Sequence, residues 1–238
     1  MQGVPSDVPS QGLVKPAIEA VPVKLWDLPV RLVHWGFVAL LPGLWWTSRE
    51  GNMPIHKLLG YSLLALVIFR VIWGFVGSET ARFRSFIKSP RIVTLYVARL
   101  VKGEQETIVG HNPLGGWSVL ALIGLLASDL AFGLFTQDVD GIESGPLARF
   151  VSYDAADWAR GWHSALFNAL LVAVAVHLVA IVFYLAIKRD NLIGPMISGR
   201  KSMSRHQVTP RTVSAWRAIF VTVISGGVAY WVAMGAPT

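Results

Sequence analysis

The sequence predicts an all-α fold, a polytopic bundle of membrane-spanning helices, and three observations lead to this prediction. Apolar residues make up 53% of the chain and charged residues only 15%, with a mean hydropathy of +0.52, whereas soluble domains are about one quarter charged. Several apolar runs are long enough to cross a bilayer as one helix. Basic residues gather in the connections between alternate runs, as they do in polytopic membrane proteins.

Residues 1–24 precede the first apolar run. They lack the basic region followed by an apolar region that marks a cleavable signal peptide. Their scattered Pro, Ser and Gly predict a flexible N-terminal arm.

The first three apolar runs cover residues 30–47, 55–76 and 116–135. The first ends with Trp45 and Trp46, aromatic residues of the kind that anchor a helix at the membrane interface. A short polar turn leads to the second run. A long polar connection then leads to the third, and within it residues 89–101 are expected to form an interfacial helix.

The fourth and fifth runs cover residues 161–188 and 213–234, and the fourth reads GWHSALFNALLVAVAVHLVAIVFYLAIK. The fifth contains Ser225, Gly226 and Gly227, a small-residue surface suited to close helix packing. We expect this surface to contact either a membrane subunit of a partner or the chain's own core.

The charge of the connections predicts the orientation of the bundle in its membrane. The connections after the second and fourth runs are basic, and the loop after the third is acidic. Basic connections stay in the cytoplasm. We therefore expect a cytoplasmic N-terminus, a periplasmic C-terminus and an acidic periplasmic loop. This distribution also explains the formal charge of +7 without nucleic-acid binding.

Two histidines interrupt the fourth run, His163 near its start and His177 in its middle. They are fourteen residues apart, which is about four helical turns and roughly 21 Å, so both rings point the same way. Histidine is costly in hydrocarbon and tends to face a bundle interior with a partner. Two stacked histidines therefore suggest two metal centres, one near each membrane surface.

Two further histidines match these in depth. His56, at the outer end of the second run, pairs with His163, and His34, near the inner end of the first run, pairs with His177. The chain has no cysteine, which excludes disulfides, iron–sulfur clusters and covalent c-type haem. Haem b needs only axial nitrogen ligands. The four histidines thus predict two bis-histidine haem b sites, whose filled coordination favours electron transfer.

Other interpretations of these histidines were considered. A lone histidine in a membrane helix can be a hydrogen-bonding residue between helices. Histidines could also bind zinc or copper, but the two pairs are about 20 Å apart along the bundle and do not converge on one centre.

Nearby cations are candidates for binding haem propionates. Arg70 follows His56 by fourteen residues, so it should face the interior at the depth of the inner site. An intramembrane arginine needs an anion, and a propionate would serve. The other candidate cations are Arg31, Arg49, Lys57 and Arg160.

Four residues are candidates for contact with a quinone. His111 and Asn112 lie in the turn GHNPLGG before the third run, and Asp129 lies well inside that run. Arg31 is the fourth candidate. His111 could instead contact the edge of the inner haem or be an ordinary surface turn histidine. Asp129 could be a hydrogen-bonded structural acid, and its functional interpretation is a proton acceptor for a quinol.

Several motifs follow one another along the chain: VRLVHW, the H-x3-GY of His56–Tyr61, RVIWGFVG, ARF, GHNPLGGW, the His163/His177 pair and the tail NLIGPMISGRK. In this order and spacing they resemble the bacterial cytochrome b561 and Ni-Fe hydrogenase cytochrome b subunit family. The resemblance implies a four-helix di-haem cytochrome b core over residues 25–201 that exchanges electrons with the quinone pool. The family's ligand positions match His34, His56, His163 and His177. Residues 202–238, with the fifth run, are an addition, and Asp129 stands where a neutral polar residue is expected.

These observations predict an electron-transfer subunit of a quinone-linked respiratory chain rather than a stand-alone enzyme. Its partner would be a periplasmic c-type cytochrome or oxidoreductase subunit, steered by the acidic loop. The alternatives are a haem-containing membrane anchor of a hydrogenase or dehydrogenase, and a superoxide:quinone oxidoreductase acting alone. A transporter is disfavoured, since the sequence shows no inverted repeat and no pair of broken helices.

Overall fold

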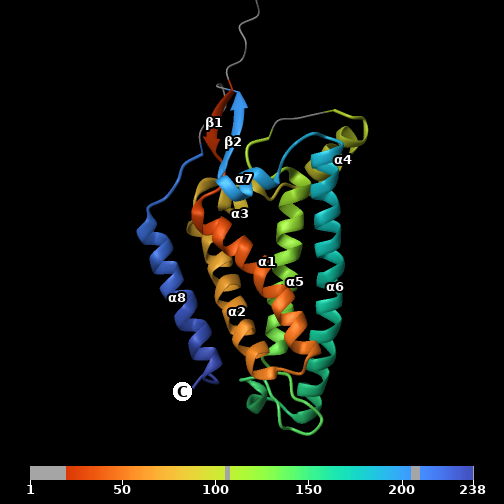
Figure 1. The fold of residues 1–238 in the computed structure, drawn as a ribbon, viewed down its shortest axis with the longest axis vertical. Coiled ribbons are helices and arrows are strands. Elements are labelled where there is room, and N and C mark those ends of the chain that lie inside the picture. The colour runs from red at the N-terminus through yellow and green to blue at the C-terminus, as the bar shows by residue number, and fades with distance from the viewer. Residues whose placement is uncertain (1–19, 105–107, 205–209, 238) are drawn as a thin grey trace, which may run out of the picture.

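The computed structural model describes residues 20–104, 108–204 and 210–237. In this part of the chain five helices are long and apolar enough to cross a membrane (Figure 1). They are α1 (Leu28–Arg49), α2 (Met53–Val76), α5 (Pro113–Gly133), α6 (Tyr153–Ala186) and α8 (Ala215–Ala233). The predicted helical fold class and the five predicted spans are therefore confirmed.

Shorter elements lie at the two ends of the bundle. The end that we call the sheet end carries the strands and α7, with α4 nearby, and the opposite end, the loop end, carries the connection between α5 and α6 and the end of α8 (Figure 1). The shorter elements are β1 (Ala20–Lys24), η1 (Glu79–Ala81), α3 (Phe83–Phe86), α4 (Pro90–Val101), η2 (Ala148–Phe150), α7 (Ile193–Ser198) and β2 (Arg200–Ser204). Helix α4 matches the predicted interfacial helix.

The long helices begin at polar capping residues. Asp27 accepts a hydrogen bond from the Val30 N–H at 2.9 Å, and Asn112 accepts one from the Gly115 N–H at 2.7 Å. Asn52 and Ser152 cap α2 and α6 in the same way. A capping side chain satisfies one of the free N–H groups of the first turn. In α1, α2 and α5 a proline follows the cap, where its missing N–H costs nothing.

Part of the region predicted to be a flexible arm is ordered. Strand β1 pairs antiparallel with β2, with Val23 opposite Lys201. The partner strand lies far along the sequence, so the local composition that suggested flexibility contains no sign of the pairing. Residues 1–19 lie outside the described part of the chain.

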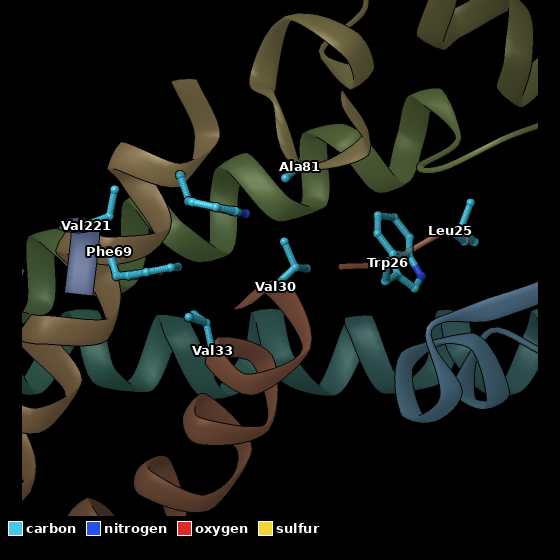
Figure 2. Close-up of a cluster of buried hydrophobic side chains, with 8 residues drawn as sticks. Leu25, Trp26, Val30, Val33, Phe69, Ala81 and Val221 are labelled. Atoms are coloured by element: carbon cyan, nitrogen blue, oxygen red, sulfur yellow. The ribbon is translucent and has the colours of Figure 1, made fainter. Parts of the chain in front are cut away.

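Two clusters of buried apolar residues form the core. The first lies at the sheet end and joins α1, α2 and the segment before α1 to Val221 of α8 (Figure 2). The second lies further along α1, α2, α5 and α6 and consists of Leu44, Leu63, Val67, Leu126, Leu130 and Leu170. By contrast, Val172, Val176 and Val179 of α6 are exposed, as expected of side chains that face lipid.

Helix α8 packs on the chain's own α2 (Figure 1). Its buried face consists of Val221, Ser225, Ala229 and Val232, and Ser225, only 1% exposed, donates a hydrogen bond to the Val221 carbonyl at 2.7 Å. Space is open beside Gly226 and Gly227. Of the small residues in the fifth run, Ser225 therefore contacts the core and the two glycines do not.

Both ends of α8 are tied to the core. Before the helix, the Glu79 N–H donates to the Arg211 carbonyl at 3.0 Å, and the Arg211 N–H donates to Glu79 Oε2 at 2.9 Å. After the helix, Arg149 Nη2 donates to the Gly235 carbonyl. The additional helix is therefore held against α2 along its length.

We predict that Ser225→Leu destabilises the protein and that Gly226→Leu does so much less. The larger side chain at position 225 must push α8 away from α2, and overpacking costs about 1–3 kcal/mol, whereas position 226 faces open space. Thermal unfolding of the detergent-solubilised variants measures the difference. Equal loss in both variants would contradict the packing described here.

Candidate functional site

The structure brings His56 and His163 together at the loop end. His56 lies in the first turn of α2 and His163 on α6, and their ring centres are 6.3 Å apart with ring planes at 82°. Metal–imidazole bonds are about 2.0–2.1 Å long. Two such bonds end to end, plus the short distance from each nitrogen to its ring centre, account for this separation. The pair therefore fits a six-coordinate iron between its rings.

Hydrogen bonds orient both rings of the loop-end pair. His56 Nδ1 lies 3.0 Å from the Leu44 carbonyl oxygen, and His163 Nδ1 lies 2.9 Å from the Asp129 carbonyl oxygen. A carbonyl oxygen can only accept, so each Nδ1 carries the proton and donates. Each Nε2 is then left with a free lone pair, the state in which neutral imidazole binds a metal.

A carboxylate also stands beside His163. Asp129 Oδ1 is 3.0 Å from His163 Nδ1, and the Asp129 residue is only 6% exposed. The carbonyl oxygen of Asp129 takes the directed hydrogen bond, so Oδ1 lies at ion-pair distance without a hydrogen-bond partner of its own. The structure thus places Asp129 next to a candidate ligand.

Gly133 and Thr47 belong to the site but were not among the predicted residues. A Cβ at Gly133 would lie 3.0 Å from His163 Cε1, so a larger residue would crowd the ring. Thr47 Oγ1 lies 3.4 Å from His56 Nδ1. The sequence held one signal for Gly133, which follows Asp129 by four residues and so shares its helix face.

The second pair, His34 and His177, lies at the sheet end. The two rings are close enough to interact electrostatically. His34 Nδ1 is buried and has no hydrogen-bond partner among the described residues, and its ring meets the Trp35 ring edge-on, with centres 5.2 Å apart. Buried polar atoms are almost always satisfied, so this nitrogen is consistent with a site whose natural occupant is a bound group.

His111 extends the sheet-end cluster. Its ring is held between Trp26 and Phe86, each with a ring centre 4.5 Å away. Burial, and then the nearby charges of Arg70 and His177, lower the pKa of His111 to about 3. His111 is therefore neutral at physiological pH and lies within electrostatic reach of His177.

Arg70 is buried beside this cluster, at 5% exposure. Its Nη1 donates to the Ala81 carbonyl at 3.3 Å, and its guanidinium lies over the Phe83 ring at 5.3 Å. The expected position of Arg70, inside the bundle at the depth of His177, agrees with this placement. One face of its guanidinium is already occupied by protein groups.

The other candidate propionate-binding cations have protein partners. Lys57 forms an ion pair with Glu143, and Arg160 forms one with Asp157. Arg49 lies over the Trp45 ring at 5.7 Å. The Lys57 pair ties the loop between α5 and α6 to the first turn of α2, next to His56.

The four candidate quinone-contact residues do not converge. Arg31 donates from Nε to the Met196 carbonyl at 3.3 Å and so ties α1 to α7. Asn112 caps α5 and donates to Tyr184 Oη at 2.9 Å. His111 lines a cavity, and Asp129 lies at the other end of the bundle, beside His163.

The cavity at His111 has a volume of about 370 Å³. Its lining consists of Glu79, Thr80, Ser85, Phe86, Val109, Gly110, His111 and Pro210. Pro210 comes from the segment that leads into α8, so the additional helix contributes to the wall. Among the described residues no group of three or more His, Asp or Glu converges in a way that could hold a metal ion.

Five apolar helices define a multi-pass membrane protein, and two histidine pairs lie within its bundle, one toward each end. The family model described as Prokaryotic cytochrome b561 matches residues 25–199. The chain belongs to this family of b-type cytochromes, and membership implies haem b as its cofactor. Helix α8 lies beyond the matched residues.

Two similar proteins carry the name "Probable Ni/Fe-hydrogenase B-type cytochrome subunit". The protein from Bradyrhizobium diazoefficiens is 27% identical over 213 residues, covering 75% of this chain and 85% of the relative. The protein from Rhizobium leguminosarum bv. viciae is 26% identical over 219 residues, covering 78% and 91%. No solved structure matches the chain significantly.

We predict that acid destabilises the protein through His111. The unfolded histidine titrates near 6.5 and the folded one near 3, so stability present above about pH 6.5 is lost as the pH falls and the unfolded chain takes up a proton. The loss is at most about 1.4 kcal/mol per pH unit. His111→Gln should therefore lose less thermal stability than the parent between pH 7 and 5. Equal losses would refute the assignment.

Proposed function

We propose that this protein carries electrons across the bacterial inner membrane through two b haems, one held by His34 and His177 and the other by His56 and His163. The observation that carries the proposal is the loop-end pair, with ring centres 6.3 Å apart and both Nδ1 atoms engaged. A bis-histidine haem supplies reversible one-electron chemistry without an open coordination position. Residues 25–201 form the di-haem unit in this proposal.

The protein's own residues orient the ligands and protect the sites. The Leu44 and Asp129 carbonyls hold the loop-end rings with Nε2 free. At the sheet end, Arg70 supplies a buried cation that can face a propionate carboxylate. The second apolar cluster, further along α1, α2, α5 and α6, keeps water out of the bundle interior.

The sheet end faces the cytoplasm in this proposal, and the loop end faces the periplasm. The basic residues of the α2–α5 and α6–α8 connections support this orientation. The loop between α5 and α6 carries Asp138, Asp140 and Glu143, and it lies over the loop-end site through the Lys57–Glu143 pair. A basic periplasmic redox partner would be attracted to this loop.

The cavity at His111 is the proposed quinone site. It offers the neutral imidazole of His111, which can donate a hydrogen bond to a quinone carbonyl, and the oxygens of Glu79 and Ser85, which can accept one from a quinol hydroxyl. Its apolar wall includes Phe86. A quinone ring has two carbonyl oxygens that accept hydrogen bonds and an apolar body, and a cavity of about 370 Å³ is within the usual range for small-molecule sites.

A second candidate function is the haem-containing membrane subunit of a hydrogenase. The names of the two similar proteins favour it. In that case the periplasmic donor would be a hydrogenase docked at the loop end, and the electron path through the histidine pairs would be the same. Co-purification of a large metalloenzyme with this protein would support this candidate over a soluble cytochrome donor.

We predict that His56→Ala and His177→Ala each reduce the haem content from two per chain to one. Each variant removes one ligand from a different site and leaves the other site intact. The pyridine haemochrome assay measures the stoichiometry. His111→Gln is the control, because His111 lies beside the sheet-end pair but is not proposed as a ligand, and it should retain two haems. Two haems in either alanine variant would end the proposal.

We predict that Val109→Trp slows haem reduction by a quinol at least about tenfold while haem content stays at two. The indole would fill the cavity that Val109 lines. Val101→Trp is the matched control, since Val101 is 82% exposed on α4 and does not line the cavity. Stopped-flow absorbance with a soluble quinol measures the rate. An unchanged rate of haem reduction in the Val109→Trp variant would contradict the assignment of the cavity as the quinone site.

A further inference from the structure

The two histidine pairs have different hydrogen-bond environments. At the loop end both Nδ1 atoms have acceptors, 3.0 Å away for His56 and 2.9 Å away for His163. At the sheet end the Nδ1 of His34 has no partner among the described residues. An acceptor on Nδ1 makes an imidazole a more basic ligand. Both loop-end ligands are therefore stronger electron donors to a bound iron than His34.

The loop-end pair also has a buried anion at its side. Asp129 Oδ1 lies 3.0 Å from His163 Nδ1, and the carboxylate is within electrostatic reach of His56. Lys57 and Arg160, the cations closest in sequence to His56 and His163, are paired with Glu143 and Asp157. Because Oδ1 has no hydrogen-bond partner, the negative charge of the carboxylate is best compensated when a bound iron carries the extra positive charge of its oxidised form.

The charges at the sheet end have the opposite balance. Arg70 is the buried cation there, within electrostatic reach of His111, which is itself close to His177. His111 is neutral. Asp27 is a buried anion within reach of Arg70, but its two oxygens accept hydrogen bonds from the Val30 N–H and from Trp73 Nε1, each at 2.9 Å. No carboxylate stands against either sheet-end histidine in the described part of the chain.

Both differences lower the reduction potential of the loop-end haem relative to that of the sheet-end haem. The ferric site carries one more positive charge than the ferrous site, so a buried anion and basic ligands favour the ferric form and lower the potential. We propose that Asp129 is a positioning residue, acting through His163, that makes the loop-end haem the lower-potential centre. Electrons would then pass from the lower-potential haem at the loop end to the higher-potential haem at the sheet end. This direction rests on the di-haem function proposed above.

If His56 and His163 held one haem and His34 and His177 the other, the transfer between the two sites would be an exchange of one electron. The loop-end haem would lose the electron that the sheet-end haem gains, with no proton moved and no covalent bond formed or broken. A reduced periplasmic redox protein would supply the electron and a quinone would accept it. The Asp129 carboxylate would thus favour the direction from the periplasmic donor toward the quinone cavity at His111.

Spectroelectrochemical titration of the purified holoprotein tests the assignment. Asp129→Asn keeps the size of the side chain and the main-chain carbonyl but removes the charge. At a fixed potential the ratio of reduced to oxidised loop-end haem should rise about tenfold, a shift of about 59 mV for one electron, and the sheet-end haem should not move. Asp129→Glu should return the ratio toward that of the parent.

Asp140→Asn is the matched control, since it removes the same charge from an exposed residue of the loop between α5 and α6 and should leave both potentials unchanged. A shift confined to the sheet-end haem, or none at either haem, would overturn the role of Asp129 and leave the di-haem function intact. If the parent protein contained no haem, the proposed di-haem function itself would be refuted.

A second measurement does not depend on the folding of any Asp129 variant. His34→Ala should keep only the loop-end haem, and His56→Ala only the sheet-end haem. The potential of the haem in the first variant should lie below that in the second. The opposite order would overturn the proposed direction of electron flow, even with two haems present in the parent protein.

Discussion

The Nδ1 hydrogen bonds of the loop-end histidines are the interaction on which the site depends. A membrane interior offers no water to satisfy a polar ring, so the helices must supply an acceptor. Leu44 and Asp129 do so with main-chain carbonyls, from α1 and α5, to rings on α2 and α6. One hydrogen bond therefore joins α1 to α2, the other joins α5 to α6, and both Nε2 atoms are left free. A Cβ at Gly133 would lie 3.0 Å from the His163 ring, so a larger residue there would crowd it.

The sheet end is organised by a different set of contacts. Asp27 caps α1 and accepts from Trp73 of α2, the strand pair joins the start of the chain to the segment after α7, and Arg31 binds the end of α7. These contacts surround His111, whose neutral ring lies between Trp26 and Phe86. Helix α8, beyond the family region, continues this assembly, because the segment before it pairs with Glu79 and lines the cavity.

Much of the arrangement could be predicted from the sequence because membrane helices obey strong local rules. Run length located all five spans to within a few residues, apart from the start of α6, which begins before its apolar run in a polar first turn. Helical spacing placed Arg70 inside the bundle. The strand pair could not be predicted, because it joins residues far apart along the chain, and neither could the partners of Lys57 and Arg160, which depend on the path of the loop.

The sequence by itself determined the helical class, the number of spans and the depth of each histidine, because length, hydropathy and periodicity act along one helix at a time. Only the tertiary structure decided which carbonyl orients each ring, that Asp129 stands against His163, and that α8 covers α2. These features depend on the rotation and approach of neighbouring helices, which side-chain packing across the bundle sets and which no single segment contains.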